Sequence, residues 1–364
     1  MFERLKKSLT LASRKYVFHL FGYLLNLLAM LTTNHLYAVS PTNPDIKRKI
    51  LEGVELTILN EFSQAERIYS TFIDQYPEEP FGYFYVAAVI QAEMLDAEDY
   101  NRIMEFEKNI ELCVRKAESK KKDRPNDPWP LFYEGSAYLY KSYMQGKEKK
   151  WWPAYRSAKK GAGRLESILE FDSTFYDAFL GIGSFKYWKS SKTKFLQWLP
   201  FIKDEIDIGI KMIKVAIESG QFVKLIARDQ LAWIFLDSGE YEKAKKYAGE
   251  NMRLYPQSRF FQWTMLEVFY RAGDKEQALV MSQRMLGNLR MLPHNNRYNE
   301  INCLLRMAEI QYDSQNYEEA RIYSHEILSL VLDEQIRERA KKKLKRALEI
   351  RQDCDKRITS FSTN

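Results

Sequence analysis

The histidines are the first residues to consider, because a histidine can bind zinc or act as a general base. Two of the four histidines lie in the first forty residues, which leaves His294 and His325. Neither lies in an HExxH motif or near a second histidine, whereas zinc sites and His-based catalytic triads bring several such groups together. We expect both residues to lie in a loop or on a helix surface.

Two pairs of glycines look like phosphate-binding loops. Gly161 and Gly163 form one pair, and Gly181 and Gly183 form the other. A dinucleotide-binding loop reads GxGxxG and follows a β-strand, but no strand pattern precedes either pair and Glu166 stands where the third glycine belongs. Close packing of helices explains the glycines better. The sequence shows no catalytic constellation, and we expect a protein that is not an enzyme and uses no cofactor and no metal.

The cysteines are odd in number and far apart: Cys113, Cys303 and Cys354. Such spacing does not predict a disulfide framework, even in a compartment that permits disulfides. We expect Cys113 and Cys303 to pack within helices and Cys354 to lie in a polar tail.

Aromatic residues mixed with lysines are more informative. All seven tryptophans lie between Trp129 and Trp263, and two stretches combine them with lysines, KEKKWWPAYRSAKK from Lys147 and KYWKSSKTKFLQWLPF from Lys186. In one interpretation the rings belong to the core and the lysines are solvated on the opposite face. In the other they form a surface for membrane headgroups, glycan or an acidic partner, because aromatic bodies with basic tips suit a membrane interface. This basic aromatic surface would comprise Lys149, Lys150, Trp151, Trp152, Lys186 and Trp188.

A repeated spacing predicts the elements that position these residues. Gly239 and Ala244 are followed thirty-four residues later by Gly273 and Ala278. This period is typical of a helix–turn–helix repeat, in which two antiparallel helices bury their apolar faces by stacking on neighbouring pairs, and each pair contacts only its neighbours. Small residues then mark close helix crossings, and glycine marks the left-handed residue that ends the first helix.

The pattern resembles that of the tetratricopeptide repeat family. That family has a small residue in the first helix, Gly or Asn at the turn, an aromatic residue and an Ala in the second helix, and a Pro at its end. The unit from Leu225 supplies Ala232, Gly239, Tyr241, Ala244 and Pro256. Three further units match in part, one with Gly53, Asn60, Phe62, Ala65 and Pro77, one with Gly273 and Ala278, and one with Ala308, Tyr317 and Ala320.

The resemblance implies an all-α fold, an α-solenoid of stacked helix–turn–helix repeats. The middle of the chain fits the pattern poorly, although a unit could open at Gly135 and place Ala158 at the Ala position. We therefore expect an irregular, aromatic-rich centre. The expected organisation is N-terminal repeat-like helices over 39–124, the irregular centre over 125–223, C-terminal repeats over 224–332, and a capping helix with a tail over 333–364.

The sequence also predicts where the helices run. We expect Asn43 to cap the first helix and Pro44 to occupy its first turn. The charged, Pro-rich segment from Lys120 to Pro130 is the best candidate for a break or a bend. The expected helices are 45–59, 61–76, 80–96, 99–121, 131–146, 151–171, 174–190 and 203–219, then the well-matched pairs to about Leu332, and finally 334–353.

The resemblance further implies a ligand groove, because in this family the first helix of each unit lines a concave surface. The family's carboxylate clamp needs Lys and Asn at such positions, and because this sequence lacks them there, binding of chaperone tails is not implied. The groove would be aromatic and acidic. Its partner-binding residues would be Asp229, Trp233, Asp237, Trp263, Glu267, Tyr270, Arg271, Glu309 and Tyr312.

Residues 1–38 have the layout of a targeting segment. A basic region precedes an apolar run from Val17 to Leu31, and a plausible cleavage site follows Ala38. The run is shorter than the roughly 20 apolar residues of a spanning helix. A cleaved secretory signal is the favoured interpretation, and an uncleaved membrane anchor or a first amphipathic solenoid helix are the alternatives. We expect an exported protein, periplasmic or associated with the envelope, or one anchored by its N-terminus.

The charge balance bears on the partner. The formal net charge is +7, and removal of the leader, with five basic residues and one acidic residue, lowers it to +3. This modest value does not indicate binding to nucleic acid. Together these features predict an exported, non-enzymatic scaffold that binds a segment of a partner protein in its concave groove. The alternative is a cell-envelope protein that associates with lipid headgroups or glycan through the basic aromatic surface.

Overall fold

The computed structural model describes residues 39–193, 204–293 and 295–362 of the 364-residue chain. The chain divides into two compact units, Met1–Ile46 and Lys47–Asn364. The predicted leader over 1–38 and His294, which we expect in a loop or on a helix surface, lie outside the described residues. None of the helices in the described ranges is long and apolar enough to cross a membrane.

Of the first unit, the structure describes residues 39–46. Asn43 accepts hydrogen bonds through Oδ1 from the backbone nitrogens of Asp45, at 3.0 Å, and Ile46, at 3.4 Å. Pro44 then opens helix α2, which covers Pro44–Ile58. A side-chain acceptor for free N–H groups and a ring that fixes φ both favour the start of a helix. The predicted cap is confirmed.

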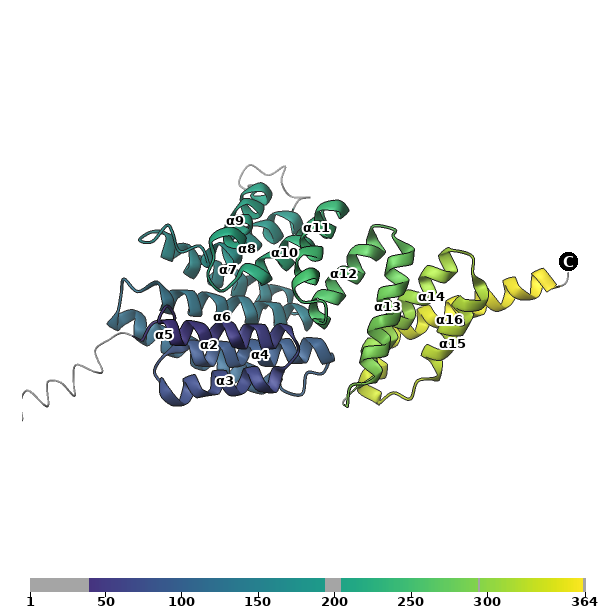
Figure 1. The fold of residues 1–364 in the computed structure, drawn as a ribbon, viewed down its shortest axis with the longest axis horizontal. Helices are drawn as coiled ribbons and strands as arrows, with labels where there is room; N and C mark the ends of the chain where they lie inside the picture. Colours follow the sequence, from purple (N-terminus) through teal and green to yellow (C-terminus); the bar gives the residue numbers. More distant parts are fainter. Residues whose placement is uncertain (1–38, 194–203, 294, 363–364) are drawn as a thin grey trace, which may run out of the picture. The chain divides into compact units, whose positions relative to one another are not determined.

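The second unit continues α2 and holds the remaining helices (Figure 1). They are α3 (Phe62–Gln75), α4 (Pro80–Ala97), α5 (Ile103–Asp123), α6 (Pro128–Lys147), α7 (Trp151–Leu169), α8 (Ala178–Lys192), α9 (Ile206–Ser219), α10 (Lys224–Asp237), α11 (Tyr241–Leu254), α12 (Arg259–Arg271), α13 (Lys275–Arg290), α14 (Tyr298–Asp313), α15 (Tyr317–Ser329) and α16 (Glu334–Ser362). From α3 onward each helix packs mainly against the helices next to it in the chain, and alternate helices such as α10 and α12 also touch. This is the packing of stacked helix–turn–helix units, so the predicted all-α repeat fold is confirmed.

The predicted helix bounds agree with the observed ones within three residues, with three exceptions. Helix α5 begins at Ile103 rather than at 99, α8 begins at Ala178 rather than at 174, and α16 continues to Ser362 rather than ending at 353. The predicted break between α5 and α6 is a turn over 124–127. It is short because Asp127 Oδ1 accepts a hydrogen bond from the Trp129 nitrogen at 3.1 Å and Pro128 takes the first helical position.

The small residues of the repeat lie where helices cross. A larger side chain at such a position would overpack the contact and push the helices apart. The alanines that the sequence assigned to these crossings have 0% exposed surface: Ala232, Ala244, Ala278, Ala308 and Ala320. Their role is therefore structural.

In four units, one residue at the end of the first helix adopts a left-handed backbone. Gly239 has φ of +77° and Gly273 has φ of +78°, as the sequence predicts. Asn60, at +66°, and Gln315, at +64°, hold the corresponding places in two other units. Glycine adopts this conformation freely and asparagine tolerates it. Gln315 is the exception, and the repeat geometry imposes the conformation on it.

At the centre of the chain, glycine replaces alanine at the helix crossings. A Cβ atom on Gly161 would lie 2.7 Å from the backbone oxygen of Gly135, and one on Gly183 would lie 2.6 Å from that of Gly209. The pairs α6–α7 and α8–α9 therefore meet backbone to backbone. This confirms the predicted close packing for Gly161 and Gly183, whereas the prediction is wrong for Gly163, where a Cβ would have no atom within 4 Å. The contact with Gly135 also moves the crossing of α7 to Gly161 instead of Ala158.

All three cysteines are free and buried. Cys354 is 0% exposed, so the prediction that it lies in a polar tail is wrong. The reason is the greater length of α16, which packs Cys354 into a small cluster beside Tyr312 and Tyr317. His325 lies exposed on α15, as expected.

Candidate partner-binding site

The predicted groove residues lie mainly on α10, α12 and α14, the first helices of three successive units. Trp233, Trp263 and Tyr270 are half-buried there, each packed by part of its ring against the core of the C-terminal repeats. A half-buried ring on a rigid helix offers apolar surface without the entropy cost of ordering a flexible side chain. We call the surface formed by α10, α12 and α14 the inner surface.

Asp229 is the most buried acid among the predicted groove residues, with 5% exposure. The Thr264 hydroxyl donates a hydrogen bond to its Oδ1 at 2.7 Å, and the Trp233 indole Nε1 donates to the Thr264 hydroxyl oxygen at 3.2 Å. Burial raises the pKa of Asp229 to about 7, against the opposing effect of the bonds from Thr264 and Trp233. The cluster thus holds the Trp233 ring and contains a carboxyl group that titrates near neutral pH.

Arginines neutralise the acids farther along the inner surface. The Arg306 guanidinium lies 3.6 Å from the centroid of the Tyr270 ring, and the Tyr270 hydroxyl donates to Glu309 at 3.3 Å. Glu267 pairs with Arg271 at 2.7 Å and with Arg306 at 3.0 Å. The surface is therefore of mixed charge, because Arg306 comes from the same helix as Glu309 and faces both acids.

Two of the predicted residues are occupied by contacts between neighbouring helices. Asp237 accepts hydrogen bonds from Ser191 at 2.7 Å and from Lys192 at 3.0 Å, which ties α10 to the end of α8. The Tyr312 hydroxyl donates to Asp353 of α16 at 2.7 Å. A ligand would have to compete with these bonds for either side chain.

The last turn of α4 and Glu98 after it reach the C-terminal repeats from far away in the sequence. The Asp96 carboxylate accepts from two nitrogens of Arg259, at 2.9 Å and 2.6 Å, and its backbone oxygen accepts from Asn299 at 2.7 Å. Glu98 pairs with Arg339 of α16 at 2.6 Å. We call this set of contacts the closure. We expected each unit to contact only its neighbouring units, and the closure shows that this expectation is wrong for this chain.

Aromatic rings reinforce the closure. The Arg339 guanidinium lies 4.9 Å from the Tyr100 ring centroid and 4.6 Å from that of Tyr298. The pKa of Lys343 is lowered by burial and by Arg306 nearby, although Glu98 opposes the shift. Charged groups near α4 and on α16 therefore meet at the edge of the inner surface. No sequence pattern signalled the contacts of Asp96 and Glu98, because their partners lie more than 150 residues away and belong to no shared motif.

The predicted basic aromatic surface divides into two parts. Trp151 and Trp152, at the start of α7, are 70% and 66% exposed, and Lys149 and Lys150 before them are exposed as well. The Trp152 ring stacks on that of Tyr155 with centroids 5.7 Å apart. This part is a true surface in the described structure, with rings that have few neighbours.

Lys186 and Trp188 lie in a different environment on α8. Lys186 pairs with Glu205 at 2.6 Å and with Glu166 at 3.3 Å. Trp188 is half-buried and packs against the core, edge-on to Tyr187 with centroids 5.1 Å apart. Because both side chains are engaged within the fold, the core interpretation suits them and the surface interpretation suits Trp151 and Trp152.

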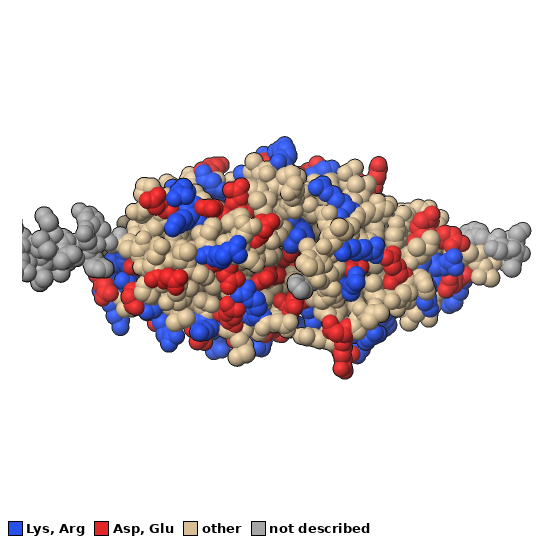
Figure 2. All heavy atoms as spheres, turned by 60° about the horizontal axis from the view of Figure 1, so that its bottom comes forward, with Lys and Arg blue, Asp and Glu red and all other residues tan. Residues whose placement is uncertain are grey.

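Charge of both signs is spread over the face of the molecule drawn in Figure 2. In the face drawn in Figure 2, lysines and arginines are interspersed with aspartates and glutamates rather than gathered in one patch. Such a surface does not generate the single-sign field that attracts polyelectrolytes. Within the described ranges, no three His, Cys, Asp or Glu side chains come together as ligands for a metal ion.

Solved structures of tetratricopeptide repeat proteins are similar to this chain. One is a tetratricopeptide repeat protein from Parabacteroides merdae, 12% identical over 83% of this chain and 98% of that one, with a TM-score of 0.39. Another is the TPR domain of P58(IPK), 12% identical over 85% of this chain and 99% of that one, with a TM-score of 0.27. No protein-family model and no curated protein matches the chain. The likeness concerns the fold alone, and the fold itself is defined by the helix pairing and buried repeat positions described above.

Proposed function

We propose that this protein is a non-enzymatic scaffold that binds an extended or helical segment of a partner protein at the inner surface. The observation that carries the proposal is the row of half-buried rings, Trp233, Trp263 and Tyr270, on α10 and α12. Binding energy at protein interfaces concentrates in a few residues, and Trp and Tyr are the most frequent among them.

The polar neighbours of these rings support the same proposal. Thr264 fixes the Trp233 indole, and Arg306 stacks on Tyr270, so both rings are held before a partner arrives. Rings that are already ordered lose little entropy on binding. The alternation of Glu267, Arg306 and Glu309 would favour a segment that carries both basic and acidic groups, because matched charges set register and exclude wrong partners.

Export is part of the proposal and is supported by the basic region and apolar run of residues 1–38. Fractionation of the protein with a C-terminal tag tests it, together with determination of the first residue of the mature form. A new N-terminus near Val39 in a soluble envelope fraction is expected. An intact Met1 in the membrane fraction would favour an anchored form, and an intact Met1 in the cytosol would rule out export.

The proposed site is tested by the substitution Trp263→Ala. The partner is captured in cells of the source organism by chemical cross-linking to the tagged protein, followed by mass spectrometry. Loss of one major protein adduct in Trp263→Ala is expected, with its retention in Trp152→Ala, which removes an exposed ring elsewhere. Unfolding of the Trp263→Ala variant would instead mean that this ring serves mainly the core.

A second function is favoured by one specific observation, the exposure of Trp151 and Trp152 at 70% and 66%. Two exposed indoles next to Lys149 and Lys150 match the chemistry of a lipid headgroup region or a glycan, where rings pack and lysines meet anions. In this function the protein associates with the cell envelope through the start of α7, while the inner surface stays free for a partner.

The double substitution Trp151→Ala with Lys149→Glu tests this second function. We expect it to abolish sedimentation with anionic vesicles, or retention on a glycan column, without a change in helical content by circular dichroism. Attraction to headgroups should also fade as salt is added, because exposed charges are screened. Unchanged retention by the double variant would end this idea.

A further inference from the structure

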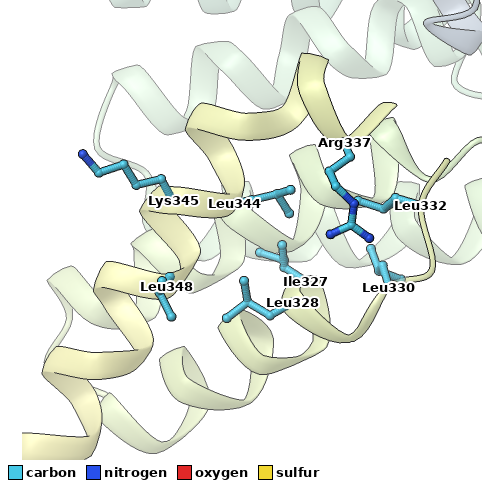
Figure 3. A pocket seen from close by; sticks show the side chains of 8 residues that line it. All are labelled: Ile327, Leu328, Leu330, Leu332, Arg337, Leu344, Lys345 and Leu348. Carbon is cyan, nitrogen blue, oxygen red and sulfur yellow. The ribbon is translucent and has the colours of Figure 1, made fainter. Parts of the chain in front are cut away.

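The C-terminal end of the array carries an apolar depression that no helix covers in the described structure. It lies between the end of α15, the turn after it, and α16, and it has a volume of about 260 Å³ (Figure 3). Its apolar lining consists of Ile327, Leu328, Leu330, Leu332, Leu344 and Leu348. A side of a repeat array on which no helix stacks is expected to be polar, and within the described residues no helix stacks on this side of α15 and α16. An uncovered group of leucines at this place therefore calls for a ligand.

A cation stands over this depression. Figure 3 shows the Arg337 guanidinium directed toward Leu330 and Leu332. In the described residues Arg337 has no carboxylate partner, and Lys345, also on the rim, has only a distant contact of 3.9 Å with Glu349. A guanidinium is suited to paired hydrogen bonds with a carboxylate. Its place beside the leucines specifies an occupant that is apolar with an acidic group at one end.

The spacing along α16 gives the length of the occupant. Arg337, Leu344 and Leu348 lie on one face of α16, at intervals of seven and four residues. With a rise of 1.5 Å per residue, the stripe runs for roughly 16 Å, or about three turns of helix. A helix of the same length places apolar side chains at positions i, i+4 and i+7 along such a stripe.

We propose that the depression between α15 and α16 is a second docking site, which binds a short amphipathic helix of a partner protein through leucine-type side chains and a carboxylate at Arg337. This site shares no residue with the inner surface. The protein would thereby hold two partners at once, one at each site.

Charge argues against two segments of this protein as occupants of the depression, namely α16 of a second copy and the leader. Helix α16 contains ten basic and five acidic residues, so a second copy that placed its own α16 against this one would bring like charges together. The leader, with five basic residues and one acidic residue, would meet the same repulsion. Like charges at an interface suppress association, whereas an acidic helix is attracted to this surface.

Shape distinguishes the occupant from a lipid surface. Four of the leucines are recessed and half-buried, namely Leu328, Leu330, Leu332 and Leu344. A bilayer is entered by protruding apolar groups on a polar helix, whereas recessed leucines receive protruding side chains. The depression therefore fits a helix with its own apolar ridge.

The test is selection of helix-forming peptides from a display library on the full-length protein, followed by fluorescence anisotropy with the most enriched peptide. We expect enrichment of peptides with apolar residues at i, i+4 and i+7 and an adjacent Asp or Glu. Arg337→Glu should weaken binding by roughly tenfold, as expected for loss of one charged hydrogen bond. Leu348→Glu should weaken it at least as much.

Two matched variants separate the site from general effects. Lys342→Glu makes the same change of charge on another face of α16, and Ile322→Glu places a charge at an exposed apolar residue of α15. Both should bind the peptide like the wild type. If Lys342→Glu weakened peptide binding as much as Arg337→Glu does, the attraction would be nonspecific and the proposal would be overturned.

Other outcomes also overturn it. Absence of any enriched peptide, or enriched peptides whose binding survives both Arg337→Glu and Leu348→Glu, would place no helix in the depression. Binding lost only in Trp263→Ala would assign the peptide to the inner surface, which leaves the first proposed function intact. Self-association seen by sedimentation and abolished by Leu348→Glu would assign the depression to a second copy, and vesicle binding abolished by it would assign the depression to lipid.

Discussion

At the scale of single residues, the most consequential group is Asp229. Its carboxyl group is 5% exposed, has Thr264 and Trp233 as hydrogen-bonding neighbours, and forms no salt bridge with a Lys or Arg of the described residues. Loss of hydration disfavours the charged form, and the bonds from Thr264 and Trp233 do not compensate for it. Its pKa is therefore raised to about 7, and the proton is held in the folded protein over a pH range in which the unfolded chain releases it.

This predicts a pH dependence of stability with a definite sign. An aspartate in the unfolded chain has a pKa of about 3.9, so between about pH 4 and pH 7 the folded state binds more protons than the unfolded state. The free energy of unfolding should then fall as pH rises through this window, by at most about 1.4 kcal/mol per pH unit from this group. Denaturation with urea at several pH values measures it.

The Asp229→Asn variant is the control, because an amide keeps the acceptor for Thr264 and does not titrate. The difference in stability between wild type and variant should change across pH 4–7 in favour of the variant. Parallel curves for the two proteins would contradict the pKa that burial implies for Asp229.

At the scale of elements, the helix crossings show what the sequence could predict. The alanines of the repeat and the left-handed Gly239 and Gly273 could be predicted from the residue spacing within one unit, because each residue's role depends on neighbours in that unit. The helix crossing at Gly161 could not be predicted in this way. The first helix of its unit, α6, has 20 residues against 14 in α10, so the spacing of the repeat positions shifts. There the glycine pairs indicated close packing but not which residue makes the contact.

The crossing of α6 and α7 predicts opposite effects for two neighbouring glycines. A Cβ on Gly161 would meet the Gly135 backbone oxygen at 2.7 Å, whereas one on Gly163 would have no atom within 4 Å. Gly163→Ala should stabilise the helix by about 0.5–1 kcal/mol. Gly161→Ala should destabilise the protein by about 1–3 kcal/mol through overpacking.

Thermal and urea denaturation of the two variants provide the measurement. Both substitutions share the gain in helix propensity, so the difference between them isolates the effect of the crossing. Equal stabilities would show that α6 and α7 do not approach each other backbone to backbone.

At the scale of the whole molecule, the closure sets this chain apart from a simple stack. The contacts of Asp96 and Glu98 with Arg259 and Arg339 join helices near the start of the array to α12 and α16. A one-dimensional array has no such links, and its units fold and unfold with their neighbours alone. Here the end of α4 is also tied to α12 and α16, and it bounds the edge of the inner surface.

A double-mutant cycle on Asp96 and Arg259 tests the closure. Their side chains are 11% and 18% exposed, so the pair is shielded from solvent. We expect a coupling energy of about 0.5–3 kcal/mol between Asp96→Ala and Arg259→Ala. The exposed pair Glu318 and Arg321, at 54% and 44%, serves as control and should give no more than about 0.5 kcal/mol. Coupling as low as that of the control would contradict the closure.

Some residues of the candidate site can be predicted from the sequence, and the contacts between units cannot. The rows of Trp233, Trp263 and Tyr270 were predictable, because repeat position fixes which side of a helix a residue occupies. The Arg306 that stacks on Tyr270, and the Arg339 that meets Tyr100, were not, because a contact between helices depends on the angle at which units stack. The apolar depression at Leu344 was not predicted for the same reason, because the spacing of leucines along a helix is the same whether or not a neighbouring helix covers them.

Photo-cross-linking in living cells tests whether a partner protein binds at the inner surface. A photoreactive amino acid is placed at Arg271, at the edge of the inner surface, and separately at Val280, which is 54% exposed on α13. We expect one discrete protein adduct from position 271, which is lost when Trp263→Ala is added, and no such adduct from position 280. An adduct of equal yield from both positions, or one from 271 that is indifferent to Trp263→Ala, would contradict binding at the inner surface.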